Sequence, residues 1–258
     1  MHEVAAQLLA GGVSAVVAKT TTAPLERLRI LQQTRTGLGT AELARSIYSK
    51  EGLSAFWRGN VPAIIRIFPT YALRLTLFDR FQIFSSKGSF SNAVVSGCSS
   101  ALVTLAVTYP LDVIRTQMAA SGRDTPVKSL VEVTRSIYKA NAFYKGFTIN
   151  MVETVPYVGI SLGSYDTLKR AYPEMPHFPI AVATGVTATV ICYPLDTLRR
   201  FIVVHPELRV QPGFEALCAD GGWRRFYRGL PIAVIKSGPT IGIILTLNDY
   251  LKTRLLAG

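Results

Sequence analysis

Apolar residues along the chain are gathered in long stretches separated by short polar segments. Residues 88–111 and 175–195 contain no Asp, Glu, Lys or Arg, and each stretch is longer than the ~20 residues that a helix needs to cross a bilayer. Residues 4–25, 59–84 and 229–251 are similarly apolar but carry one or two basic residues near the middle of each stretch. Because a charge facing lipid is costly, these three stretches are predicted to be membrane helices that line a polar cavity.

Three motifs recur in the same order and divide the chain into thirds. A proline followed by an acid and a base occurs as APLERLR, YPLDVIR and YPLDTLR. An aromatic-basic-glycine turn follows each copy, and an acid lies near the end of each third. Self-similarity at a fixed period indicates a repeat architecture. We therefore predict an all-α membrane protein with six transmembrane helices in three pseudo-threefold repeats, 1–86, 87–172 and 173–258, each with a short additional helix, which together form one domain.

The chain is strongly basic, with 28 Lys and Arg against 16 Asp and Glu and a formal charge of +12. A charge of this kind is typical of nucleic-acid-binding proteins. However, 49% of the residues are hydrophobic, only 17% are charged and the mean hydropathy is +0.29, which is too apolar for a soluble basic domain. No aromatic-basic platform recurs, so we expect no nucleic-acid polymer as a partner.

The residue types that serve most enzymes are scattered. No Ser/His/Asp, Cys/His or metal-ligand spacing occurs, and the three histidines are far apart in the sequence. Cys98, Cys192 and Cys218 have no metal-ligand spacing and are expected to serve packing. We therefore expect neither an enzyme, nor a metal site, nor a cofactor.

Each proline motif combines a helix-bending residue with a pair of opposite charges. Proline removes a backbone donor, so Pro24, Pro110 and Pro194 are predicted to kink their helices. The acid and the base lie three residues apart, one helical turn, and form either a pair within one helix or a ring in which the acid of one helix meets the base of the next. The threefold repetition favours the ring. Its members are Glu26, Arg29, Asp112, Arg115, Asp196 and Arg199.

These motifs, over essentially the whole chain, resemble those of the mitochondrial carrier family. The resemblance implies a multi-pass protein of the mitochondrial inner membrane, or of a peroxisomal or other organelle membrane, which exchanges solutes as a monomer by alternating access. It makes the charged ring a matrix-side gate, with Gln33 bracing one of its bridges. It also implies a cytoplasmic gate formed by Asp79, Gln82, Asp166, Lys169, Asp249 and Lys252, which is one bridge short of three. The second repeat departs from the pattern, since SIYKANAFYKG lacks the acid-glycine pair.

The resemblance also implies that the aromatic-basic-glycine turns bind the headgroup of cardiolipin. Each turn places a basic residue beside the beginning of an apolar stretch, where the amides at a helix N-terminus favour anions. Anchoring of the basic and aromatic side chains at the bilayer interface is the alternative. The residues concerned are Arg58, Gly59, Lys145, Gly146, Arg228 and Gly229.

Positions that differ among the repeats are the candidates for solute recognition, because repeated positions serve the scaffold. Arg66, Glu153 and Lys236 occupy equivalent positions, seven residues after each glycine, and lie at the depth where the family contacts its substrates. Lys19 and Arg74 are further unrepeated charges; interface snorkelling and a lipid-facing position are the respective alternatives. Tyr157, four residues after Glu153, is expected to stack on a ring or to serve structure, and Thr154 adjoins Glu153.

Four bases and one acid in a cavity favour a small anionic metabolite carrying several phosphates. The closest motifs are those of adenine nucleotide, coenzyme A and thiamine pyrophosphate carriers, although PLDTLRRFIVV lacks the run of three arginines and three methionines of ADP/ATP carriers. Glu153 also departs from the adenine-nucleotide pattern. The alternatives are a carrier of another anionic or amino-bearing metabolite and a carrier homologue that does not transport.

Overall fold

The computed structural model describes residues 2–35, 38–83, 90–122 and 129–256, and these residues are helical with short connections and without a β-strand. The six long helices are α1 (His2–Thr34), α3 (Asn60–Ile83), α4 (Phe90–Ala120), α6 (Phe147–Ala171), α7 (His177–Val204) and α10 (Leu230–Leu256). The shorter ones are α2 (Thr40–Glu51), the 3-10 helix η1 (Leu53–Trp57), α5 (Leu130–Lys139), α8 (Val210–Ala219) and α9 (Trp223–Phe226).

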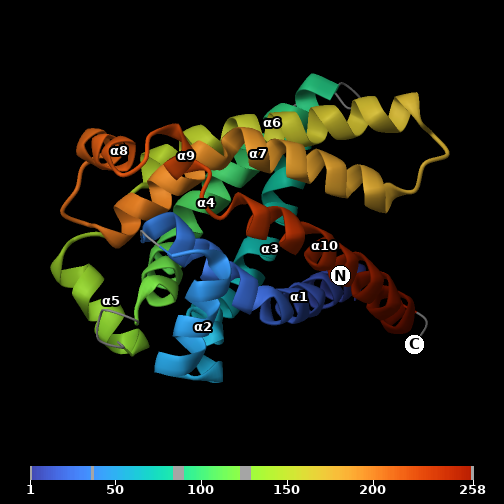
Figure 1. Ribbon diagram of the computed structural model, residues 1–258. Coiled ribbons are helices and arrows are strands. Elements are labelled where there is room, and N and C mark those ends of the chain that lie inside the picture. The colour runs from blue at the N-terminus through green and yellow to red at the C-terminus, as the bar shows by residue number, and fades with distance from the viewer. Residues whose placement is uncertain (1, 36–37, 84–89, 123–128, 257–258) are drawn as a thin grey trace.

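The long helices form a closed ring in the order α1, α3, α4, α6, α7 and α10 (Figure 1). Packing is most extensive between neighbouring repeats, where α3 lies along α4, α6 along α7, and α10 along α1. The short helices α2, α5 and α8 gather at one end of the molecule, which we call the ring end. The two chain termini lie near the other end, which we call the far end.

The apolar core lies at the ring end, in three clusters related by the repeat. Each cluster buries one face of a short helix against the C-terminal half of the first long helix of its repeat, which is α1, α4 or α7. Val133 and Ile137 of α5 pack with Val113 of α4, and Leu43 and Ile47 of α2 pack in the same way with residues of α1. The third cluster joins α7, α8 and α9. Burial of these faces fixes the short helices beneath the ring.

Each aromatic-basic-glycine turn requires a glycine because atoms of an adjacent helix lie very close to it. Gly59, Gly146 and Gly229 have φ angles of 82°, 76° and 86°, a left-handed conformation that other residues rarely adopt. A Cβ atom at Gly59 would lie 2.8 Å from the carbonyl oxygen of Arg115. These turns therefore seat α3, α6 and α10 against the adjacent helices.

Four of the helical segments are long and apolar enough, by length and composition, to cross a membrane. They comprise residues 8–34, 95–120, 177–204 and 223–254. The remaining ring members, α3 and α6, have 24 and 25 residues. Pro24, Pro110 and Pro194 all lie inside their helices, and the kinks expected from them remain predictions.

Candidate functional site

A ring of buried ion pairs joins α1, α4 and α7 at the ring end. Arg115 Nη2 lies 2.9 Å from Glu26 Oε1, Arg199 Nη1 lies 2.5 Å from Asp112 Oδ2, and Arg29 Nη2 lies 2.6 Å from Asp196 Oδ2. The acid of each helix thus meets a base of another repeat, and the three pairs close a cycle. Each of these side chains is at most 11% exposed. We call these six residues the charge ring.

Two further side chains strengthen the Asp196 corner of the charge ring. Gln33 donates from Nε2 to Asp196 Oδ2 at 2.8 Å and to Thr197 Oγ1 at 3.2 Å, which is the bracing contact expected from its position. Arg200, which sequence reasoning did not single out, donates to Asp196 Oδ1 at 2.9 Å and to Glu26 Oε1 at 3.2 Å. The ring therefore holds one more arginine than the repeated motif indicates.

We call Arg66, Glu153 and Lys236 the mid-span residues, and each of them approaches one member of the charge ring. Arg66 Nη1 of α3 lies 3.4 Å from Asp112 Oδ1 of α4. Glu153 Oε2 of α6 lies 3.7 Å from Arg199 Nε of α7. The Nζ of Lys236 on α10 forms a short ion pair with Glu26 of α1. A group bound at these three residues is therefore in direct contact with the ring.

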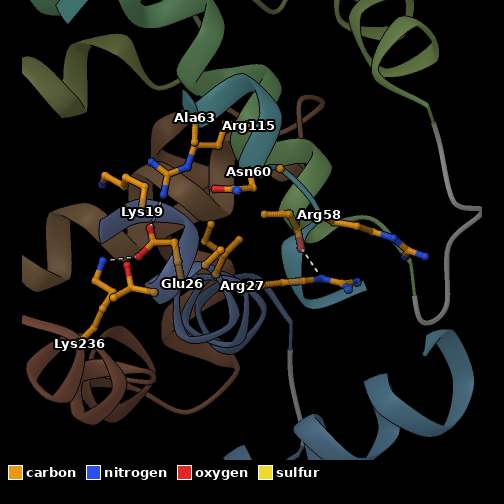
Figure 2. A pocket seen from close by; sticks show the side chains of 13 residues that line it. Lys19, Glu26, Arg27, Arg58, Asn60, Ala63, Arg115 and Lys236 are labelled. Carbon is orange, nitrogen blue, oxygen red and sulfur yellow. Dashed lines mark hydrogen bonds and ion pairs between the residues drawn. The ribbon is translucent and has the colours of Figure 1, made fainter. Parts of the chain in front are cut away.

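Lys19 lies beside the same cluster and lines a pocket with Glu26, Arg115 and Lys236 (Figure 2). The pocket continues past Ala23 towards Arg58 and Asn60 at the beginning of α3. Lys19 forms no hydrogen bond or ion pair within the described part of the chain. Its position seven residues before Glu26 places both residues on one face of α1.

The other candidate solute residues lie closer to the far end. Arg74 and Tyr157 line a cavity of about 450 Å³ together with Tyr71, Ser100 and Ser161. The Thr154 hydroxyl donates to the carbonyl oxygen of Asn150 at 2.6 Å, so it is engaged within its own helix. Arg74 and Tyr157 therefore lie in a second, larger cavity, separate from the pocket at Lys19.

The six residues proposed for the far-end gate form no bridge between helices in the part of the chain that is described. Asp166 pairs with Arg170 of its own helix at 2.9 Å. Lys169 donates to the carbonyl oxygens of Pro173 and Met175 at 2.6 and 2.9 Å. Asp249 and Lys252 form no ion pair there, and the side chains of Asp79 and Gln82 lie outside the described set. The residues of the charge ring thus form ion pairs between helices, whereas these gate residues form none within the described part of the chain.

The basic residues of the three turns differ in their surroundings. Arg58 forms a short ion pair with Glu51, whereas Arg228 is 4.0 Å from Asp220. The aromatic residues of the first two turns bond to the first long helix of their own repeat. Trp57 Nε1 donates to the Thr20 carbonyl of α1 at 2.9 Å, and the Tyr144 hydroxyl donates to the Ala106 carbonyl of α4 at 3.3 Å. The turns are therefore fixed on the helices beside them.

Hydrogen bonds from neighbouring repeats also satisfy the carbonyl groups at the C-terminal ends of α1, α4 and α7. Arg225 donates to the carbonyls of Gln32 and Gln33 at 3.1 and 3.0 Å. Arg27 reaches those of Ala119 and Ser121, and Gln117 donates to that of Val203 at 3.0 Å. No motif repeated along the chain predicts these contacts. We refer to them as the cross-repeat caps.

Comparison with known proteins places this architecture in a family. The sequence model described as mitochondrial carrier protein matches residues 1–89, 86–176 and 173–258. The chain belongs to the mitochondrial carrier family. It is therefore a multi-pass membrane protein and a transporter rather than an enzyme, and its helical architecture is that of a carrier.

Similar proteins include carriers from plants and a mammal. A thylakoid ADP,ATP carrier protein of Arabidopsis thaliana is 30% identical over 98% of this carrier and 66% of its own length. Carrier protein CoAc2 of Zea mays is 31% identical, with 96% and 86% covered. ADP/ATP translocase 2 of Rattus norvegicus is 29% identical over 96% of both chains.

Proposed function

We propose that this carrier exchanges a phosphorylated, nucleotide-like metabolite across the mitochondrial inner membrane by alternating access. Adenine nucleotides such as ADP and ATP are the first candidates, followed by coenzyme A and thiamine pyrophosphate. The observation that carries the proposal is the contact of the three mid-span residues with the charge ring. A solute bound there and the ring compete for the same side chains.

The chemistry of the cluster favours a solute with several negative charges. Arg66 and Lys236 pair with two different ring acids, Asp112 and Glu26. Lys19 adds a cation whose side chain has no hydrogen-bonding partner among the described residues. Phosphoryl oxygens accept charge-assisted hydrogen bonds from such groups. A polyphosphate can therefore engage cations on α1, α3 and α10 at the same time.

This competition gives a route by which the solute opens the ring end. Removing one partner of a buried ion pair typically costs about 3–5 kcal/mol, so the ring does not open unless other groups replace the lost contacts. An anion that draws Arg66 from Asp112 and Lys236 from Glu26 supplies such replacements. The size of the shift towards a state open at the ring end is set by how much more tightly the anion binds that state than the closed one.

The names of similar proteins support the same solute class. Two of those described above are named ADP,ATP or ADP/ATP carriers, which is consistent with the cationic cluster. Plastid and mitochondrial proteins both occur among the relatives, so the inner mitochondrial membrane remains part of the proposal. We also propose that the carrier acts as a monomer and binds cardiolipin at Lys145, Arg228 and the adjoining turns.

Transport by the reconstituted protein tests the function. In liposomes, the wild type is expected to exchange labelled ADP or ATP, and Lys19→Ala, Arg66→Ala and Lys236→Ala are each expected to lower that exchange at least about a hundredfold. Lys139→Ala, at an exposed position of α5, is the matched control and should exchange normally.

Two outcomes would contradict the proposal. The first is a wild-type protein that moves carboxylates or amino acids but none of ADP, ATP, coenzyme A or thiamine pyrophosphate. The second is normal exchange by all three variants. Circular dichroism and size-exclusion chromatography of each variant separate a loss of exchange from a loss of folding.

A second candidate function rests on Glu153. Its Oε2 atom is buried and accepts no hydrogen bond, and it faces the equally unbonded Nε of Arg199. A carboxylate placed in this way suits a metabolite that carries an amino group, or a carrier homologue that binds without transporting. Thermal stabilisation by a solute without any flux would favour the latter.

A further inference from the structure

The three short helices at the ring end differ in how charge is placed on their outer surfaces. On α5, the exposed Arg135 lies between the exposed Val131 and Tyr138 along one face. On α2, the exposed Arg45 lies one turn before the exposed Tyr48. α8 contains no basic residue and one acid. Basic residues thus interrupt the apolar surface of α2 and α5, whereas α8 has none.

Apolar side chains occupy the outer surface of α8 and the beginning of α9. Val210 is 49% exposed and Phe214 is 39% exposed, and their spacing of four residues places both on one face of α8. Trp223, the first residue of α9, is 69% exposed. We call these three residues the apolar face. It points outward at the ring end and is left uncovered by the described part of the chain.

The core beneath the apolar face holds it in place. The ring centroids of Phe214 and Trp223 lie 5.3 and 5.5 Å from that of Phe226, which is 1% exposed. Gly213 allows α8 to lie close to α7, since a Cβ atom there would be 2.9 Å from Cγ1 of Ile202. α8 is therefore packed tightly against the C-terminal end of α7 while its apolar face remains exposed.

The apolar face is continuous with parts of the chain that span the membrane. Trp223 begins the segment 223–254, which is long and apolar enough to cross a bilayer. Ile149 of α6 belongs to the same core cluster as Phe226, and Val152, one turn further along α6, is 57% exposed. The apolar face therefore lies where the long helices α6 and α10 begin (Figure 1).

We propose that the apolar face docks into the interfacial region of the bilayer, in the leaflet at the ring end. Tryptophan is enriched at this depth because its ring is amphipathic, and a helix with an apolar and a polar side lies in the plane of the interface. Gln211 and Glu215 form the polar side of α8, where Gln211 Nε2 donates to Glu215 Oε1 at 3.0 Å. Because α8 packs on α7, the docked face also fixes the depth of a helix that carries two members of the charge ring.

Tryptophan fluorescence tests the depth of the apolar face. Trp57→Phe leaves Trp223 as the single tryptophan of the chain. In nanodiscs of phosphatidylcholine that is brominated near the glycerol end of its acyl chains, the emission of Trp223 is expected to be quenched relative to unbrominated lipid. Bromine near the ends of the acyl chains should quench less, because the ring lies at the interface. Emission that neither lipid quenches would overturn the proposal.

Cysteine labelling compares the two sides of α8. In a background without the native cysteines, Phe214→Cys and its matched control Gln211→Cys are placed in the same nanodiscs, where both faces of the bilayer are open to a charged thiol reagent. Both positions are exposed in the protein itself, so a difference in rate reports what covers them. Phe214→Cys is expected to react about tenfold more slowly, because apolar surroundings disfavour the thiolate.

The two measurements distinguish the bilayer from other occupants of the apolar face. A second copy of the chain would slow the labelling of Phe214→Cys but leave Trp223 unquenched by brominated lipid, and that combination would overturn the proposal. Equal labelling rates at the two positions would show that the face lies in water and would overturn it as well. If Trp57→Phe does not fold, a fluorescent label on Phe214→Cys replaces Trp223 in the quenching measurement.

Discussion

At the scale of single residues, one contact on each of α3, α6 and α10 joins the proposed solute site to the charge ring. Arg66 and Lys236 contact ring acids, whereas Glu153 contacts a ring base. At Glu153 the charges are therefore exchanged, since the mid-span residue is the acid and the ring residue is the base. An acid at this level weakens the attraction of the site for anions, and for this reason it is the residue most suited to set selectivity.

Replacing Glu153 by glutamine isolates that effect. Glu153→Gln keeps the shape of the side chain and removes its charge, while Arg199 keeps its 2.5 Å contact with Asp112. Binding of a nucleoside triphosphate should become about tenfold tighter, a change of ~1.4 kcal/mol, as measured by competition in a thermal-shift assay. Unchanged or weaker binding would show that Glu153 does not oppose the anion.

A repeated motif predicted some of the residues at the ring end and not others. The spacing of Glu26 and Arg29 indicated the ring because the same acid-base pair recurs in all three repeats, so that the acid of one helix can meet the base of the next. Arg200 was missed because it adjoins Arg199 and has no counterpart in the other repeats. Arg27 was missed for the same reason, and its contacts with carbonyls of α4 depend on packing that no local pattern records.

At the scale of helices, the Asp196 corner of the charge ring joins α1 to α7 through several hydrogen bonds. Asp196 accepts hydrogen bonds from Arg29 and Gln33 of α1 and from Arg200 of its own helix. Removal of this carboxylate would leave buried donors on two helices without an acceptor. This corner should therefore contribute more to stability than a surface ion pair does.

Asp196→Ala tests the contribution of this corner. The substitution should destabilise the folded carrier by about 3–5 kcal/mol, and thermal unfolding in detergent measures the loss. Asp166→Ala is the matched control, because its partner Arg170 is 74% exposed and surface pairs contribute about 0–1 kcal/mol. Gln33→Ala, which removes one neutral donor, should cost about 1 kcal/mol. Equal losses for the two aspartate variants would contradict this account.

The elements themselves were largely predictable. The uncharged stretches indicated the long helices, because a helix that crosses a bilayer must be long and apolar. The threefold period indicated how these helices are grouped. The period did not reveal that the second repeat, without its acid-glycine pair, still places α5 beneath the ring; there Ser129 and Glu132 form a capping box at the beginning of α5.

At the scale of the whole molecule, the two ends differ in how far they are bridged. The charge ring joins three repeats at the ring end, whereas the described charges at the far end pair locally or bond to loop carbonyls. Ion pairs between repeats thus bridge the helices at the ring end, and the described charges form no such bridge at the far end. Closure there would require Lys169 to release the carbonyls of Pro173 and Met175 before it could reach another helix.

Cysteine labelling tests this asymmetry. In a background without the three native cysteines, Ser161→Cys lines the larger cavity and should react quickly with a membrane-impermeant thiol reagent. Thr116→Cys, at a position that is 2% exposed beside the ring, should react at least about a hundredfold more slowly, because a buried thiol reacts only during local opening. Similar rates at the two positions would contradict a conformation closed at the ring end.

The cross-repeat caps bear on how the protein is made. The carbonyls of Gln32 and Gln33 receive hydrogen bonds from Arg225, which follows them by more than 190 positions in the chain. During synthesis, the end of the first helix therefore waits for the last third of the protein before its cap can form. A chain that ends before Arg225 therefore leaves these carbonyls without the hydrogen bonds that the complete protein supplies.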